Sequence, residues 1–223
     1  MAMDREGIRI IPAPINAHQF TTNAYTMSDI LVLYYSHSGS VRELARHVAR
    51  GIESVDGASA RIRTVPKVAP VTKIAEPAVP PDGAPYATAQ DLAECIGLAL
   101  GSPTRFGNMA APMKYFLDGT AGEWMHGTLS GKPAAVFTST STQHGGNEST
   151  LLSMMLPLLH HGMVLVGVPF TEPLITTTLK GGTPYGASHV SGAVNDINLS
   201  EAEKGIAFAL GKRLATTALK LAA

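Results

Sequence analysis

Cysteine is almost absent from this chain, and its charges cancel. Cys95 is the only cysteine, which excludes an intrachain disulfide and fits a reducing compartment, so we expect a cytoplasmic protein. The 17 basic residues balance 17 acidic ones, so the sequence has no basic field for nucleic acid and no polybasic tract for a membrane surface. No apolar run reaches membrane-spanning length. We therefore expect neither a nucleic-acid partner nor membrane insertion.

Several motifs of nucleotide and metal sites are missing as well. No Gly-x-Gly-x-x-Gly opens the first predicted helix and no Gly-Lys-Ser/Thr occurs, which argues against a dinucleotide-binding Rossmann site and against a P-loop. The pair His160 and His161 has no third ligand nearby in the sequence, and neighbouring helical residues point in different directions. The sequence therefore predicts no metal site.

The first 28 residues differ in character from the rest. They combine charged and polar residues with prolines and contain neither an apolar signal-peptide core nor a small-residue cleavage site. We expect residues 1–28 to form a disordered N-terminal extension. Residues 29–223, in a chain with 45% hydrophobic residues, are long enough to form one domain with a substantial core.

A strand, a tight turn and a helix N-terminus are predicted near the start of this domain. Residues 30–35 form an apolar run rich in β-forming residues, and residues 36–41 contain hydroxyl side chains and glycine. From Val41 onward, apolar residues recur at helical spacing. The free N–H groups of such a turn and the positive end of the helix dipole suit a phosphate. The same pattern also fits an ordinary turn with a serine N-cap.

The alternation of strands and helices continues along the chain and predicts an α/β fold. We expect a doubly wound, five-stranded parallel sheet of strand order 2-1-3-4-5, with helices on both faces. A long excursion at 169–199 precedes the last helix, for which Ser200 and Glu203 form a capping box. The predicted strands are residues 30–35, 60–65, 96–101, 132–139 and 163–168.

Polar, glycine-bearing loops follow three of these strands, at 36–41, 102–108 and 138–146. In the order 2-1-3-4-5 these three strands are adjacent, so their loops meet at one edge of the sheet. Ligands of doubly wound folds bind at that edge, and flavin mononucleotide (FMN) suits a hydroxyl-rich phosphate turn in this strand order.

Five strings resemble the WrbA family of flavodoxin-like, tetrameric NAD(P)H:quinone oxidoreductases, and the resemblance spans residues 29–221. It implies FMN as cofactor, NADH or NADPH as reductant, a small-molecule quinone as substrate, a homotetramer, and an active site completed by neighbouring subunits. The strings are Tyr34-Tyr-Ser, Pro103-Thr-Arg-Phe-Gly-Asn108, Phe116-Leu-Asp, His160-His-Gly-Met163 and Gly181-Gly-Thr-Pro-Tyr-Gly-Ala187.

The same resemblance implies roles for individual residues. Trp124 and His160 would be the catalytic residues, and Trp124 and Tyr185 would contact the quinone. Two departures are visible: Ser38 stands where the family often has tyrosine, and the loop after the fourth strand is one residue longer than a common form. The implied cofactor-binding residues are Ser36, His37, Ser38, Gly39, Ser40, Val41, Thr104, Arg105, Phe106, Gly107, Asn108, Ser139, Thr140, Ser141, Thr142, Gln143, His144, Gly145 and His160.

Structural roles are an alternative for two of these residues. A lone tryptophan such as Trp124 is usually a core or interface anchor, and a histidine at a helix end such as His160 is favoured there by the dipole. The function predicted for the whole chain is FMN-dependent reduction of quinones, by two electrons and with ping-pong kinetics. The alternatives are a flavodoxin-type electron carrier and a regulatory FMN-binding protein without turnover.

Overall fold

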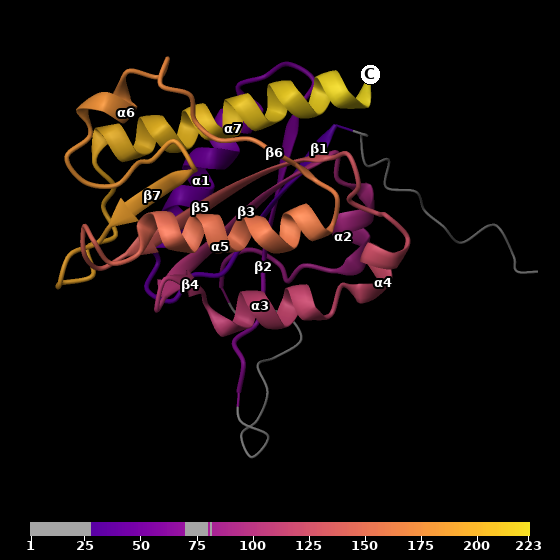
Figure 1. The fold of residues 1–223 in the computed structure, drawn as a ribbon, viewed down its shortest axis with the longest axis horizontal. Helices are drawn as coiled ribbons and strands as arrows, with labels where there is room; N and C mark the ends of the chain where they lie inside the picture. The colour runs from indigo at the N-terminus through magenta and orange to yellow at the C-terminus, as the bar shows by residue number, and fades with distance from the viewer. Residues whose placement is uncertain (1–27, 70–79, 81) are drawn as a thin grey trace, which may run out of the picture.

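A parallel sheet lies at the centre of the computed structural model, which describes residues 28–69, 80 and 82–223 (Figure 1). The strand order β2-β1-β3-β5-β6 confirms the predicted order 2-1-3-4-5. The predicted extension therefore lies outside the described residues, except for its last residue. The strands of this path are β1 (Asp29–Tyr34), β2 (Ser59–Thr64), β3 (Gly97–Arg105), β5 (Pro133–Thr140) and β6 (Val164–Leu165).

Helices cover both faces of the sheet, as predicted. On one face α1 (Ser40–Glu53) packs beside α7 (Glu201–Ala222), and on the other lie α2 (Ala89–Glu94), α3 (Ala111–Asp118) and α5 (Asn147–His160) (Figure 1). Two buried apolar clusters, one on each face, fix these layers. No helix in the described part of the chain is both long and apolar enough to cross a bilayer. Two further short helices are α4 (Ala121–Met125) and α6 (Leu174–Thr177).

Helices α1 and α7 approach each other closely because glycines lie at the contact. A Cβ atom on Gly51 would lie 2.0 Å from the carbonyl oxygen of Phe208, and one on Gly211 would lie 2.0 Å from that of Val48. Any side chain at either position would push the helices apart. This close contact fixes α1, and with it the turn at the N-terminus of α1, against the core.

The fifth strand is split, which differs from the continuous strand predicted at 163–168. Only β6 pairs with the start of β5; the chain then leaves the sheet and returns as β7 (Ala187–Val190), which pairs with the end of β5. A Cβ on Gly186 would lie 2.1 Å from the carbonyl oxygen of Val136, so only glycine permits this return. As a result, part of the predicted excursion is a strand that ends beside the loops of β1, β3 and β5.

A short hairpin at the end of β3 was not predicted either. The strand β4 (Asn108–Met109) pairs antiparallel with the last residues of β3. Phe106 and Gly107 form its tip, with positive φ angles of 54° and 76°. The hairpin projects the loop of β3 beyond the edge of the sheet.

Candidate functional site

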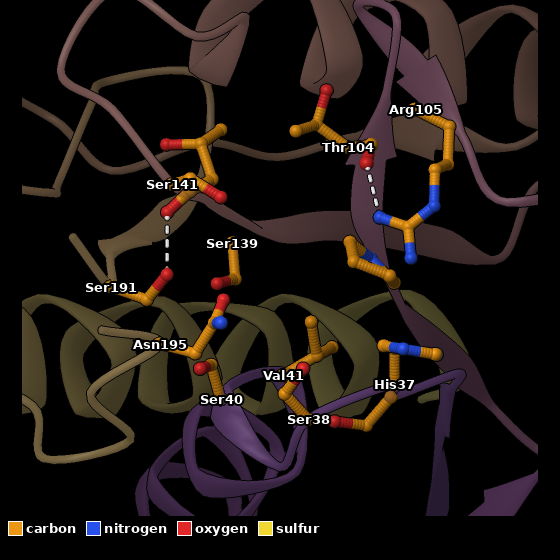
Figure 2. A pocket seen from close by; sticks show the side chains of 13 residues that line it. His37, Ser38, Ser40, Val41, Thr104, Arg105, Ser139, Ser141, Ser191 and Asn195 are labelled. Atoms are coloured by element: carbon orange, nitrogen blue, oxygen red, sulfur yellow. Dashed lines mark hydrogen bonds between the residues drawn. The ribbon is translucent and has the colours of Figure 1, made fainter. Parts of the chain in front are cut away.

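A cavity of about 120 Å³ lies at the carboxyl ends of β1, β3 and β5 (Figure 2). The three polar loops predicted to meet at one edge of the sheet do meet there. Ten of the residues implied as cofactor-binding line it, and they come from all three loops. They are Ser36, His37, Ser38, Ser40, Val41, Thr104, Arg105, Ser139, Thr140 and Ser141.

The turn between β1 and α1 offers backbone N–H groups to this cavity. Gly39 has a φ of 105°, and the Ser36 hydroxyl accepts from the N–H groups of Gly39 (3.1 Å) and Arg42 (3.4 Å). The N–H groups of Ser40 and Val41, in the first turn of a 14-residue helix, have no partner among the described residues. Free N–H groups at the positive end of a helix dipole form an anion site.

The side chains around the cavity also favour an anion. Arg105 is a permanent cation, and its Nη1 donates to the carbonyl oxygen of Thr104 at 2.7 Å. His37 lies on the same side of the cavity as Arg105, opposite Ser139 and Ser141 (Figure 2). Among the described residues, no carboxylate lines the cavity. The donors and the charge therefore fit a phosphate group.

The size of the cavity limits what it encloses. Pockets that bury a whole drug-sized ligand measure roughly 300–1,000 Å³, well above the 120 Å³ found here. The cavity therefore fits the phosphate of FMN and part of its ribityl chain, while the flat ring would lie at the rim. Phe106 is fully exposed at that rim, on the tip of the β3–β4 hairpin.

Several implied cofactor-binding residues do not line the cavity. The Asn108 carboxamide oxygen accepts from the N–H of Met109 (2.8 Å) and from Ser153 (3.2 Å), so this side chain shapes the hairpin. Gln143 donates to the Lys180 carbonyl at 3.2 Å. The implied residues that lie outside the cavity lining are Gly39, Phe106, Gly107, Asn108, Thr142, Gln143, His144, Gly145 and His160.

The loop after β5 is held by a buried residue that sequence reasoning did not single out. Asn147, the first residue of α5, accepts from the Thr140 hydroxyl at 3.1 Å and donates to the Gln143 carbonyl at 3.2 Å. Gly146 precedes it with a φ of 98°. These contacts turn the chain sharply from β5 into α5 and present Ser141 to the cavity.

Two lining residues come from the segment that was predicted only as an excursion. The Ser191 hydroxyl donates to the Thr140 carbonyl at 3.1 Å, which ties it to the end of β5. Asn195 has a φ of 55° and directs its side chain between Ser40 and Ser139 (Figure 2). No local sequence signal identifies either residue, because the pairing of β7 with β5 brings them here. Pro103 also lines the cavity without having been singled out.

Trp124 and His160 lie together, but in a separate hollow of about 390 Å³. The indole N–H of Trp124 donates to the His160 carbonyl at 2.8 Å. His160 ends α5, whose first residue, Asn147, contacts the cavity wall, and 14 helical residues span about 20 Å. Neither Trp124 nor His160 lines the polar cavity of its own chain.

Tyr185, the other residue implied to contact the quinone, is partly exposed between β6 and β7. It lines neither the polar cavity nor the hollow that contains Trp124.

His161 lies in the wall of the second hollow. Its Nε2 is 3.0 Å from the Thr120 hydroxyl, while its Nδ1 is buried without a hydrogen-bond partner in the described structure. Burial lowers the pKa of His161 below its usual 6.5. The His161 ring is therefore neutral at pH 7. The charged residues Lys114 and Asp118 also line this hollow, and they form an ion pair with each other at 2.6 Å.

Comparisons with known proteins agree with this architecture. The family described as NADPH-dependent FMN reductase matches residues 28–171. A relative from Trichlorobacter lovleyi named NAD(P)H dehydrogenase (quinone) is 42% identical over 209 residues, 88% of this chain and 100% of the relative. A flavodoxin, WrbA-like protein from Agrobacterium tumefaciens has a TM-score of 0.63 at 19% identity, covering 86% and 98% of the two chains. A flavodoxin from the domain Archaea has a TM-score of 0.57 at 18% identity, covering 86% and 99%. The fold is therefore flavodoxin-like.

Proposed function

The chain belongs to the NADPH-dependent FMN reductase family, and from this premise we propose that it is an FMN-dependent NAD(P)H:quinone oxidoreductase. The observation that carries the proposal is the polar cavity at the carboxyl ends of β1, β3 and β5, where the described residues supply free N–H groups and no carboxylate. The relative from Trichlorobacter lovleyi, which the alignment covers in full, supports quinone as the substrate.

In this proposal the chain binds and orients the cofactor. The N–H groups of Ser40 and Val41 and the surrounding hydroxyls hold the phosphate, and Arg105 adds a positive charge beside it. Bound FMN would supply the redox chemistry, taking a hydride from NADH or NADPH and passing two electrons to a quinone with ping-pong kinetics. The β3–β4 hairpin, with Phe106 at its tip, would border the ring.

A second copy of the chain would bring Trp124 and His160 to the flavin. Within one chain these residues lie at the far end of α5 from the cavity wall, so a neighbouring subunit would have to supply them. The outer face of α5 supports such an assembly, because Leu152, Leu156 and Leu159 recur at helical spacing and are 45%, 61% and 53% exposed. We propose a homotetramer that buries this face.

The proposed activity predicts a reversible colour change. Protein incubated with FMN and freed of excess cofactor should remain yellow, bleach with NADH or NADPH, and regain its colour when benzoquinone is added without any partner protein. Steady-state rates with varied NADH and quinone should give the parallel lines of ping-pong kinetics. Yellow protein that neither reductant bleaches would support a regulatory protein. An electron carrier would stay yellow with either reductant alone and would bleach only when a partner reductase is added.

Leu156→Glu should dissociate the proposed tetramer, because it places a charge at the centre of the exposed face of α5. Light scattering should show smaller species that still bind FMN, with quinone reduction reduced at least about tenfold, since Trp124 would leave the neighbouring site. Trp124→Ala should reduce quinone turnover similarly without dissociation. Leu221→Glu, at an exposed position near the end of α7, is the control and should leave both properties unchanged. A fully active monomer would contradict the shared site.

A further inference from the structure

A buried ion pair lies directly behind the β7 side of the cavity. His189 and Glu203 are 1% and 0% exposed, and the His189 Nδ1 is 3.1 Å from the Glu203 Oε1. The same carboxylate accepts from the N–H groups of Gly181 (3.0 Å), Val190 (3.1 Å) and Ser200 (2.7 Å). Glu203 thus connects three segments: the loop before β7, through Gly181; the end of β7, through Val190; and the start of α7, through Ser200.

The second nitrogen of His189 holds the loop that carries Asn195. Its Nε2 is 2.8 Å from the carbonyl oxygen of Asp196. The Asp196 N–H in turn donates to the Ser191 carbonyl at 2.8 Å, so the loop between Ser191 and Asp196 is closed on itself. Within that closed loop, Ser191 and Asn195 both line the cavity.

Both partners of the ring are hydrogen-bond acceptors, a carboxylate and a carbonyl. A neutral imidazole has a single N–H and can satisfy only one of them, whereas the charged ring donates to both. If His189 loses its proton, the remaining N–H goes to the carboxylate, which binds it more strongly, and the Asp196 carbonyl is left without a donor. The anchor of the loop therefore depends on the charge of one side chain.

We propose that His189 is a positioning residue for cofactor binding: its charged ring, held by Glu203, anchors the Asp196 carbonyl and so keeps Ser191 and Asn195 in place around the phosphate of FMN. This inference rests on the proposed binding of FMN. It adds that affinity for the phosphate declines when His189 becomes neutral. When His189 is neutral, the side chains of Ser191 and Asn195 are no longer held beside the phosphate, whereas the N–H groups of the turn before α1 keep their positions.

The groups around His189 set the direction of the pH effect. Burial alone would lower the pKa of His189, but the hydrogen bonds to Glu203 and to the Asp196 carbonyl outweigh it and raise the pKa above 6.5. The other charged groups that act here are the Asp196 carboxylate and, through it, Lys180. The loop is therefore anchored below the raised pKa and released above it.

The test is a titration of apoprotein with FMN between about pH 7 and pH 9.5, where the phosphate ester stays doubly ionised. The wild-type dissociation constant should rise about tenfold across this range, as expected for the loss of one hydrogen bond to a charged group. Affinity for riboflavin, which lacks the phosphate, should change far less. Failure of the wild type to bind FMN at pH 7 would refute the proposed function. Binding at pH 7 with no change up to pH 9.5 would refute only the role of His189.

Two variants isolate the bond to Asp196. His189→Asn and His189→Gln both remove the charge, but only the longer glutamine amide reaches the Asp196 carbonyl. We expect His189→Asn to bind FMN about tenfold more weakly at pH 7 with no pH dependence. His189→Gln should bind more tightly than His189→Asn, also without pH dependence. The control His126→Asn, at the exposed end of α4, should keep the wild-type profile. A wild-type profile in His189→Asn would overturn the inference.

Discussion

Replacing both Ser36 and Ser40 by glutamate should abolish FMN binding. Both side chains line a cavity of about 120 Å³, so each new carboxylate would lie within a few ångströms of the phosphate. Two like charges 4 Å apart repel by about 4 kcal/mol at an effective dielectric constant near 20. The affinity should therefore decrease at least about a thousandfold, measured by calorimetric titration of the apoprotein.

Two further variants separate charge repulsion from damage to the turn. The Ser36 hydroxyl accepts two backbone N–H groups, whereas the Ser40 hydroxyl makes no hydrogen bond within the described structure, so Ser40→Glu alone should cause most of the loss. Ser54→Glu, beyond the opposite end of α1, is the matched control and should bind FMN as the wild type does. A double variant that retains its yellow cofactor would show that the phosphate binds elsewhere.

Glu203→Ala should have the largest effect on stability. It removes the acceptor of three backbone N–H groups and leaves the charge of His189 buried without a partner. Breaking a buried ion pair by removing one member costs about 3–5 kcal/mol of the free energy of unfolding, measured by denaturant titration. Glu201→Ala, two residues away on the surface, should leave stability nearly unchanged. Equal stability of the two variants would mean that the buried pair does not stabilise the fold.

The same pair predicts how stability depends on pH. Burial alone would raise the pKa of Glu203, but hydrogen bonds from His189 and from the N–H groups of Ser200 and Val190 lower it to about 2. Its contribution is therefore complete above pH 4.5 and is lost as the pH falls toward 2. The contribution of His189, whose pKa is raised, is complete below pH 6.5 and is lost as the pH rises through that raised value. In the Glu203→Ala variant, the free energy of unfolding should therefore change less with pH in both of these ranges.

Local sequence patterns predicted the parts of the site that depend on neighbouring residues. The run 30–35 and the helical spacing after Val41 predicted β1 and α1, and the same reasoning predicted β3 and β5 within a few residues. Hydroxyls and glycines at the strand ends then located the three loops of the cavity. The predictions that rest on resemblance, such as the roles of Trp124 and His160, remain proposals.

Contacts between segments far apart in the sequence decided the remaining features of the fold and of the site. The return of Ala187–Val190 to the sheet depends on pairing with β5, about 50 residues earlier, so no local period marks it. Ser191 and Asn195 reach the cavity only through that return. The separation of Trp124 and His160 from the polar cavity likewise follows from the length and direction of α5. By itself the sequence predicted β1, β2, β3 and β5, the strand order and the polar turn before α1, because these follow from periodicity, short connections and backbone geometry. Tertiary structure alone decided which distant residues complete the cavity wall, because that depends on packing across the sheet.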